Sequence, residues 1–317
     1  MKPDLSSPEA LAAPPTPGLI SLCVGTFRRP DGIVAAARSL LAQEVPAGWR
    51  TEVIVVDNDP TGSARAPLQD HLRADERSRI RYVVESAPGV SHMRNRCLDE
   101  ARGELIAFID DDETAPSGWL GHMVDALQRH QADAVFGPVE PVYVTPPPAW
   151  VTVNGVHHRA RRRTGETLAW EAAQTNNVLM RRHLLDGGLR FSALFARTGG
   201  EDSFLFGQAL QAGRRLVWCD EASVQETVPP VRTTRRWILG RAFHGGRTYV
   251  RLRHHLGWRA AYPMLALYGL VYAAVVMLPM LLLTSVGHPR HMHYALKFAG
   301  NLGKIAARFY DAGRYGH

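Results

Sequence analysis

The sequence contains few cysteines. Cys23, Cys97 and Cys219 are the three among 317 residues, and none has the paired spacing of a disulfide framework or a zinc site. We therefore expect reduced side chains that neither bridge nor bind metal, as in a reducing compartment. The chain also lacks a signal-peptide pattern, because residues 1–17 are rich in proline, alanine and serine and have no apolar core. We expect these residues to form a disordered lead.

Positive charge is unevenly distributed along the chain. The formal net charge is +7, and cations gather in residues 157–163 and again in residues 232–259. These stretches lack an interleaved aromatic platform or a known binding motif, so we predict no nucleic-acid partner. Residues 262–286 then form an uncharged stretch that is long enough to cross a bilayer. Arginines before such a span favour a cytosolic catalytic side and contact with anionic membrane lipids.

The arrangement of the apolar span stays open at this point. Pro263 and Pro279 make a buried helical hairpin an alternative to membrane association. Lysines and arginines beyond the span make its far side basic too, at Lys297, Lys304, Arg308 and Arg314. A span that crosses the bilayer and one that lies in it are both compatible with this pattern. In the second case residues 292–310 would form an interfacial amphipathic helix, and both flanks would stay cytosolic.

Three consecutive carboxylates, Asp110, Asp111 and Asp112, follow the apolar residues 105–109. A run without polar alternation predicts a buried strand, so the acids should emerge at its carboxyl end, where open α/β sheets bind ligands. Neighbouring like charges repel one another unless they share a cation. Hard oxygen ligands without histidine or thiolate nearby favour Mg²⁺ or Mn²⁺. The alternative is an acidic loop that caps a helix starting near Pro116.

The surrounding pattern alternates strands with helices. Apolar runs at residues 20–24, 53–56, 80–84 and 134–139 predict further strands, and helical periodicity predicts helices over residues 31–41, 91–102 and 116–130. This alternation predicts an α/β fold with a mostly parallel nucleotide-binding sheet flanked by helices. Polar residues would then gather where the strands end.

Five motifs follow one another along the chain: Val24-Gly25-Thr26-Phe27-Arg28-Arg29-Pro30, Val55-Val56-Asp57-Asn58, Met93-Arg94-Asn95, Phe108-Ile109-Asp110-Asp111-Asp112 and Gly200-Glu201-Asp202. In this order they resemble the family 2 inverting glycosyltransferases, which have the A-type glycosyltransferase fold. Residues 224–251 resemble the membrane-associated members that build bacterial surface polysaccharides. The resemblance implies a catalytic domain over residues 18–230, followed by a basic and apolar helical membrane-associating region over residues 231–317.

For the donor side, the resemblance implies binding of a nucleotide-sugar. Asp57 would accept a hydrogen bond from the imide N–H of the base, which favours a UDP-linked donor. Thr26 and Arg28 would border the same nucleotide pocket, and Arg94 would lie near it or near the diphosphate. Asp111 would face the donor sugar or the ribose.

For the chemistry, the resemblance implies a metal site and a general base. Asp110 and Asp112 would hold Mn²⁺ or Mg²⁺, which offsets negative charge on the leaving nucleotide. Many members have a histidine as a further ligand, and Glu226 stands at the comparable position here. Asp202 would take the proton of the acceptor hydroxyl in a single displacement, which inverts the anomeric configuration.

For the acceptor side, the resemblance implies that Asn176, Asn177 and Glu201 line the site. The acceptor would be a glycan or a polyprenyl-linked saccharide, and the protein would act at the cytoplasmic face of the inner (plasma) membrane.

Several residues have plainer interpretations. Asp57 lies in an Asp-Asn-Asp-Pro sequence typical of turns, and Glu201 and Asp202 suit the first turn of a helix that extends to Gln211. A haloacid dehalogenase-type phosphotransferase with a nucleophilic Asp110 is the main rival function, although its motif normally follows the first core strand. An inactive sugar-nucleotide-binding scaffold is the third interpretation.

Overall fold

The computed structural model describes residues 14–307, which divide into two compact units. The sheet unit comprises residues 14–140, 160–196 and 201–226, and the helical unit comprises residues 141–159, 197–200 and 227–307. The helical unit thus takes up three short segments of the predicted catalytic domain, residues 141–159, 197–200 and 227–230. Residues 1–13 of the predicted lead lie outside the described residues, and Thr16 and Pro17 already belong to the first strand.

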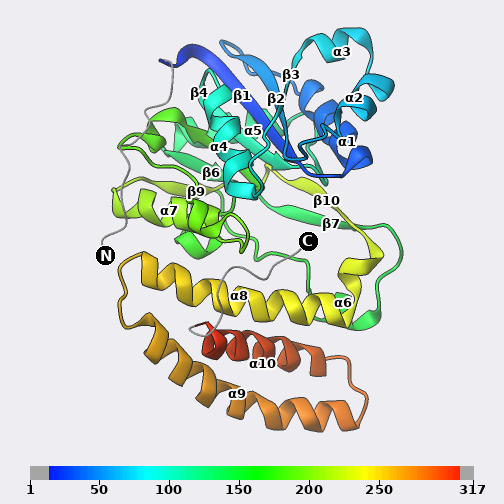
Figure 1. Cartoon of the computed structure of the whole chain (residues 1–317), viewed down its shortest axis with the longest axis vertical. Helices are drawn as coiled ribbons and strands as arrows, with labels where there is room; N and C mark the ends of the chain where they lie inside the picture. Colours follow the sequence, from blue (N-terminus) through cyan, green and yellow to red (C-terminus); the bar gives the residue numbers. More distant parts are fainter. Residues whose placement is uncertain (1–13, 308–317) are drawn as a thin grey trace. The chain divides into compact units, whose positions relative to one another are not determined.

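Strands and helices alternate along the sheet unit (Figure 1). Its strands are β1 (Thr16–Thr26), β2 (Arg50–Asp57), β3 (Ile80–Val84), β4 (Gly103–Asp110), β5 (Glu113–Thr114), β6 (Ala134–Phe136), β8 (Asn177–Arg181) and β9 (Leu216–Trp218). Its helices are α1 (Pro30–Leu41), α2 (Arg65–His71), α3 (Ala74–Ser78), α4 (Val90–Glu100), α5 (Trp119–Arg129) and α7 (Glu201–Gln211). Strands β7 (Val139–Tyr143) and β10 (Val224–Val228) continue into residues assigned to the helical unit. Short 3₁₀ helices cover Trp170–Ala172, Arg182–Leu185, Ala193–Phe195 and Pro230–Thr233.

The central sheet has seven strands in the order β3-β2-β1-β4-β8-β6-β9. Strands β3, β2, β1 and β4 pair in parallel, as do β6 and β9, whereas β8 is antiparallel to both of its neighbours. This confirms the predicted mostly parallel α/β fold. A smaller sheet has the order β5-β10-β7.

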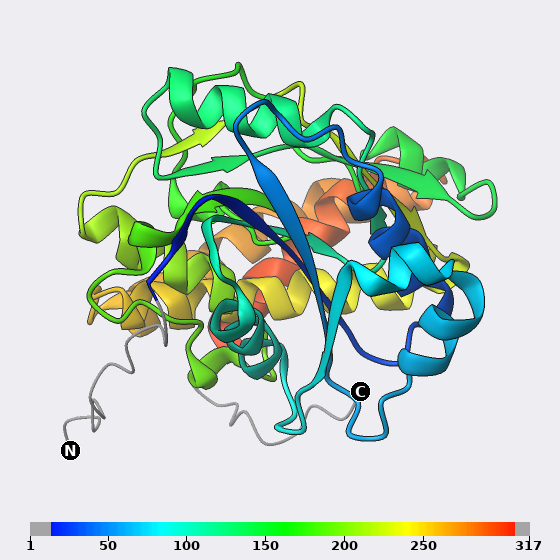
Figure 2. The same ribbon diagram turned by 90° about the horizontal axis from the view of Figure 1, so that it is seen from above.

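The core lies on both faces of the central sheet. Leu22 and Val24 of β1 pack into one cluster with residues of α1 and α5, whereas Cys23, which points to the opposite face, packs with residues of α4 and α7. Figure 2 shows α4 and α5 on opposite sides of the sheet. Each fully buried aliphatic side chain contributes about 1.5–3 kcal/mol. Burial on both faces explains why these strands are continuous apolar runs.

Two local predictions differ from the structure. The strand predicted over residues 134–139 is divided at Gly137 and Pro138 between β6 and β7. Pro138 has no N–H to donate, and a Cβ at position 137 would lie 2.0 Å from the Ala222 carbonyl oxygen, so the chain must leave the central sheet here. Asp31 lies in the first turn of α1 and does not cap it, because the cap residue is Arg29. Cys23, Cys97 and Cys219 are buried and free.

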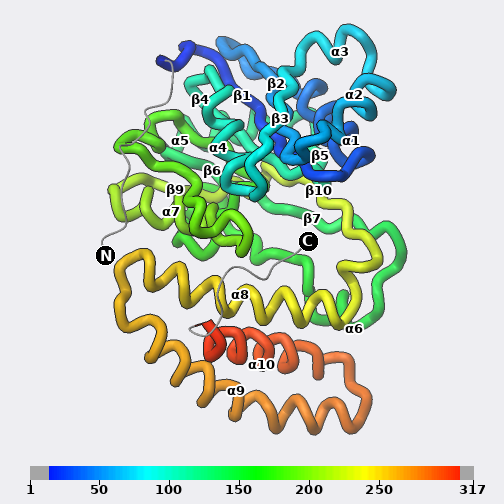
Figure 3. The backbone as a smooth tube through the Cα atoms, in the orientation of Figure 1, coloured from blue at the N-terminus to red at the C-terminus, as the bar shows by residue number. Residues whose placement is uncertain are grey.

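The helical unit contains α6 (Ala149–Val153), α8 (Arg235–His255), α9 (Ala261–Ser285) and α10 (His291–Ala306). Figure 3 traces the chain through α8, α9 and α10, which reverse direction at tight turns. Helices α8 and α10 approach closely, since a Cβ at Gly246 would lie 1.9 Å from the Gly300 carbonyl oxygen. Helix α9 is long and apolar enough to span a membrane by length and composition, with a mean hydropathy of 2.2 and 22% of its apolar window buried.

Candidate active site

The carboxyl ends of three parallel strands meet at one edge of the central sheet. Thr26 at the end of β1 pairs in register with Asp57 at the end of β2, and Gly25 pairs with Asp110 at the end of β4. We call this the polar edge. The structure therefore brings together the strand-end residues that the sequence pattern singled out, at the kind of edge where open α/β sheets bind ligands.

The acidic triplet contacts Arg29, a residue of the first motif to which the sequence analysis gave no role of its own. Arg29 Nη1 lies 2.7 Å from Asp111 Oδ1 and 3.0 Å from Asp112 Oδ2. Thr26 Oγ1 donates a hydrogen bond of 2.7 Å to Asp111 Oδ2. Burial raises the pKa of Asp111, and Arg29 and Thr26 oppose that shift. Part of the repulsion expected within the triplet is thus balanced by the protein itself.

The turn after β1 directs two adjacent arginines to different acids. Arg28 has a φ of 55°, a left-handed conformation that costs a residue with a Cβ about 1–3 kcal/mol. Its Nε lies 2.8 Å from Asp59 Oδ2, whereas the side chain of Arg29 reaches the triplet. Strain of this kind clusters at functional sites. Arg28 is largely exposed at this turn, and its predicted contact with a nucleotide stays a prediction.

Arg94 connects the triplet to α7. It is buried, its Nη2 lies 3.3 Å from Asp110 Oδ1, and its Nη1 forms an ion pair with Glu201 Oε1. Burial acts to lower the pKa of Arg94, but the Glu201 and Asp110 carboxylates outweigh it and raise that pKa. Burial raises the pKa of Glu201, and Arg94 opposes this shift. The guanidinium of Arg94 therefore stays charged and fixes the first turn of α7 beside the triplet.

Asp202 is the partly exposed neighbour of Glu201 in the first turn of α7. Its Oδ1 accepts a 2.6 Å hydrogen bond from the Ser203 N–H, and its Oδ2 lies 3.4 Å from the Thr175 N–H. Glu201 is buried in its ion pair with Arg94, so Asp202 is the one of these two neighbouring acids that a ligand can reach.

A buried carboxylate outside the predicted set supports the loop of the triplet. Glu113 Oε2 accepts a 2.9 Å hydrogen bond from the Asp110 N–H, and its Oε1 accepts one of 3.0 Å from Asn176 Nδ2. The signal for Glu113 was its position as the fourth acid of the run that begins at Asp110. Asn176, predicted to lie on the acceptor side, therefore contacts the acidic loop.

Asn177 has a different environment from its neighbour. Its Nδ2 donates 2.8 Å hydrogen bonds to the carbonyl oxygens of Pro138 and Ala222, and its Oδ1 accepts one of 2.9 Å from Trp119 Nε1. The side chain is buried. It ties β8 to α5 and to two loops, and its predicted contact with an acceptor stays a prediction.

Asp57 is also engaged within the protein. Its Oδ1 accepts from the Asp59 N–H at 2.9 Å, and its Oδ2 accepts from the Ala64 N–H at 2.7 Å and from Tyr82 Oη at 2.8 Å. The residue has no exposed surface. These contacts match the turn interpretation, and a direct bond to a nucleotide base requires the turn after β2 to move.

The acids of the polar edge have the chemistry of a magnesium or manganese site. Asp110 and Asp112 offer hard carboxylate oxygens, and their side chains are 42% and 16% exposed. Glu226 stands opposite Glu113 in the β5–β10 register and is half-buried. Within residues 14–307 no group of three or more His, Cys, Asp or Glu side chains is arranged to hold a metal. Mg²⁺ is usually bound by one or two carboxylates together with substrate phosphates, and Asp110 and Asp112 fit that mode.

The strand order of the central sheet and the acids of the polar edge place the protein in the class with the A-type glycosyltransferase fold. The mannosyltransferase PcManGT from Pyrobaculum calidifontis, solved with GDP-Man and Mn²⁺, is 19% identical, with 94% of this chain and 89% of that chain covered at a TM-score of 0.57. Residues 1–349 of S. aureus TarS, solved with UDP, are 18% identical, with 92% and 91% covered at a TM-score of 0.50.

Sequence comparison identifies the family within this class. The glycosyl transferase family 2 model matches residues 21–187. The succinoglycan biosynthesis protein ExoM of Rhizobium meliloti is 36% identical over 240 residues, which cover 74% of each chain. A GalNAc(5)-diNAcBac-PP-undecaprenol beta-1,3-glucosyltransferase of Campylobacter jejuni is 29% identical over 120 residues, 37% of each chain. The chain belongs to glycosyl transferase family 2, and the predicted family is confirmed.

Proposed function

We propose that this glycosyltransferase moves a sugar from a nucleotide-sugar, with UDP favoured, to a lipid-linked saccharide during surface polysaccharide synthesis, with inversion at the anomeric carbon. The relation to ExoM, a succinoglycan biosynthesis protein, supports the pathway class. The Campylobacter jejuni relative, whose name gives an undecaprenyl-diphosphate acceptor, supports a lipid-linked acceptor. The Mn²⁺-bound mannosyltransferase supports a divalent cation at Asp110 and Asp112, with Glu226 as the third candidate ligand.

In this scheme the polar edge binds the donor. Thr26, Arg28 and Asp111 border the nucleotide and its sugar, and Asp57 is assigned to the base. A carboxylate has about four acceptor positions, and Asp57 uses three of them within the protein, so one remains for a ligand after local movement. A bound divalent cation would offset the charge on the leaving diphosphate.

Asp202 is the general base of the proposed reaction. Its carboxylate takes the proton of the acceptor hydroxyl while that oxygen bonds to the anomeric carbon and the bond from this carbon to the nucleotide breaks. One displacement inverts the configuration. Glu201, with Asn176 and Asn177, is assigned to the acceptor side, and the ion pair of Glu201 with Arg94 holds the base in position.

One observation carries the proposal. Arg94 contacts both Asp110, a proposed metal ligand, and Glu201, the neighbour of the proposed base. Through this single buried side chain the two ends of the reaction share one rigid support. A haloacid dehalogenase-type phosphotransferase has no use for such a link, and its motif would follow the first strand and not β4.

The test uses full-length protein in detergent and a panel of nucleotide-sugars with Mn²⁺ or Mg²⁺. Asp202→Asn should lower transfer by about 10²- to 10⁴-fold, because an amide cannot accept the proton, while donor affinity stays the same. Asp125→Asn, which changes an exposed acid on α5, is the matched control. Normal transfer by Asp202→Asn, or a product with retained configuration, would contradict the mechanism. A covalent phosphate on Asp110 would favour the phosphotransferase.

Membrane association at the cytoplasmic face of the inner membrane is part of the proposal. Helix α9 exposes many large apolar side chains, among them Met264, Leu267, Leu270, Val271, Val275, Leu278, Leu281 and Leu282. Exposed apolar surface of this extent marks an interaction site. Full-length protein should float with vesicles that contain phosphatidylglycerol, and protein that stays soluble without detergent or lipid would refute this part.

A further inference from the structure

The helical unit is rich in cations and poor in acids. Between residues 227 and 307 the chain has eleven arginines and lysines and no aspartate or glutamate, and residues 141–159 and 197–200 also contain no acid. An excess of cations makes a positive potential that attracts anions.

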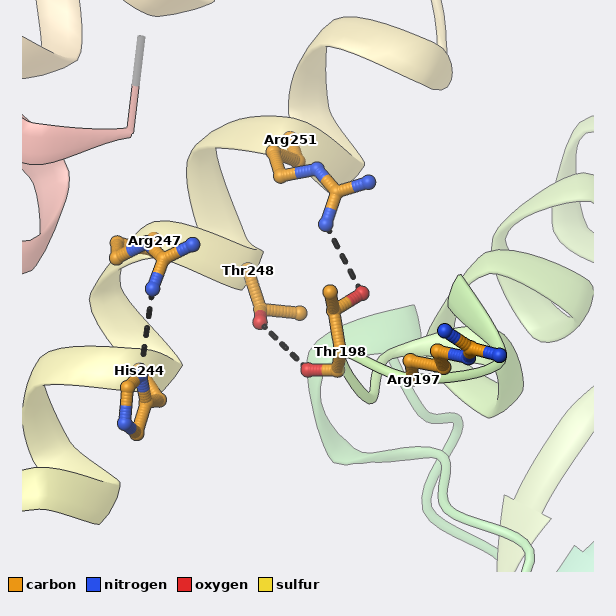
Figure 4. Close-up of a pocket in the computed structure, with 6 residues that line it drawn as sticks. All are labelled: Arg197, Thr198, His244, Arg247, Thr248 and Arg251. Atoms are coloured by element: carbon orange, nitrogen blue, oxygen red, sulfur yellow. Dashed lines mark hydrogen bonds between the residues drawn. The ribbon is translucent and has the colours of Figure 1, made fainter. Parts of the chain in front are cut away.

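Six residues of this unit line a cavity of about 140 Å³ (Figure 4). They are Arg197, Thr198, His244, Arg247, Thr248 and Arg251. The last four lie on α8 at i, i+3, i+4 and i+7, so they share one face of the helix. This volume is well above the roughly 10–15 Å³ that a single water needs. We call this cavity the arginine pocket.

Hydrogen bonds give the arginine pocket a fixed shape. Arg251 Nη1 donates to Thr198 Oγ1 over 2.9 Å, and Thr248 Oγ1 lies 3.4 Å from the Thr198 carbonyl oxygen. These contacts fasten the loop of residues 197–200 to α8. Figure 4 shows Thr248 and Arg251 directed at Thr198, and Arg247 directed at His244.

The pocket chemistry is that of a phosphate site. Arg247 is only 4% exposed, so its guanidinium is a buried charge at the wall of the cavity, with two further guanidiniums on the same lining. Like charges at one site are relieved by an anion. Guanidinium groups and hydroxyls are donors that match phosphate oxygens. Burial and Arg247 lower the pKa of His244, so the ring adds no further positive charge at neutral pH.

We propose that the arginine pocket binds the diphosphate of the polyprenyl-linked acceptor. This rests on the proposed function and assigns its acceptor site. Thr198 stands four residues before Asp202, so the chain itself keeps their Cα atoms within about 14 Å however the units are arranged. A diphosphate held here would place the first sugars of the acceptor within reach of the base. Apolar α9 belongs to the same unit and suits the hydrocarbon chain.

The experiment measures binding to the full-length protein in detergent, with geranylgeranyl diphosphate as the probe. Arg197→Gln and Arg251→Gln should each weaken its binding by roughly 10- to 100-fold, as expected for loss of a charge-assisted hydrogen bond. Arg247→Lys keeps the positive charge but loses the paired N–H donors of the guanidinium, so it should weaken binding less than Arg251→Gln does. Arg241→Gln, on the same helix but outside the pocket lining, is the matched control and should leave binding unchanged. Arg197 is exposed at the surface, so its variant tests the site even if a variant of buried Arg247 does not fold.

Two further measurements separate the sources of phosphate. UDP affinity and flotation with phosphatidylglycerol vesicles should be the same in Arg197→Gln, Arg251→Gln and the wild type. A parallel loss of UDP affinity would assign the pocket to the donor, and a parallel loss of flotation would make it a general lipid contact; either result overturns the proposal. Equal weakening of geranylgeranyl diphosphate binding by Arg241→Gln would also overturn it, as would unchanged binding in Arg197→Gln and Arg251→Gln. Because this readout needs no turnover, failure of sugar transfer would refute the proposed function separately.

Discussion

Replacement of Gly32 by alanine should disturb the polar edge without touching any charged group. A Cβ at this position in α1 would lie 2.4 Å from the carbonyl oxygen of Asp111. Real Cβ atoms almost never come closer than 3.0 Å, so the two backbones must separate by at least about 0.6 Å. Overpacking of this kind costs about 1–3 kcal/mol, and alanine's better helix propensity returns at most about 1 kcal/mol.

The functional effect of Gly32→Ala should exceed the effect on stability. A shift of about 1 Å in a catalytic group can cost 10²-fold in rate, so we expect at least a ten-fold loss of sugar transfer and weaker metal-dependent donor binding. Gly121→Ala in α5 is the control, because its Cβ would meet nothing within 4 Å. Thermal unfolding, donor titration and nucleotide release would be compared for both variants. Identical behaviour of the two would refute the argument that α1 positions the triplet.

Three further predictions concern other parts of the chain. Gly246→Ala should destabilise the packing of α8 on α10 by about 1–3 kcal/mol, whereas Gly245→Ala, whose Cβ meets nothing, should be neutral or stabilising in thermal unfolding. Each carboxylate oxygen of Glu113 accepts a hydrogen bond, so in Glu113→Gln the new NH₂ group would face either the Asp110 N–H or the Asn176 amide. This variant should therefore lower stability by about 1–3 kcal/mol and weaken donor binding in titrations. Arg28 and the N–H of the following turn lower the pKa of Asp59 to about 2. Its contribution to stability should therefore be complete above about pH 4, the unfolded value, and be lost as the pH falls towards 2, a dependence that Asp59→Asn should remove from acid-unfolding curves.

The predicted strand ends were correct because their signal is local. Continuous apolar runs at β1, β2 and β4 mark strands buried on both faces, and each is followed at once by polar residues. β8 was not predicted, since five residues that begin with an asparagine give no clear period. Its antiparallel pairing with β4 depends on long-range contacts that no local pattern encodes.

The details of the site depended on conformations that the sequence does not reveal. Arg28 and Arg29 are chemically alike, and the turn in which Arg28 has a left-handed φ directs Arg28 to Asp59 and Arg29 to the triplet. In the same way, the burial of Asp57 follows from the Tyr82 hydroxyl on the neighbouring strand β3 and from a turn that closes at Ala64. The identities of the polar residues could be predicted from the order of the motifs, whereas their partners could not.

The composition of the helical unit has a consequence for its response to ionic strength. Eleven like charges between residues 227 and 307 repel one another, and self-repulsion weakens a compact state. At physiological salt the screening distance is about 8 Å, whereas at 0.01 M it is about 30 Å. In dilute buffer the repulsion therefore extends along the whole of α8 and α10, and the two helices are held together against it by their close backbone contact at Gly246 and Gly303. Multivalent anions should make this unit more rigid, because they screen the repulsion between its cations. The rigidity of the sheet unit should not change with these ions.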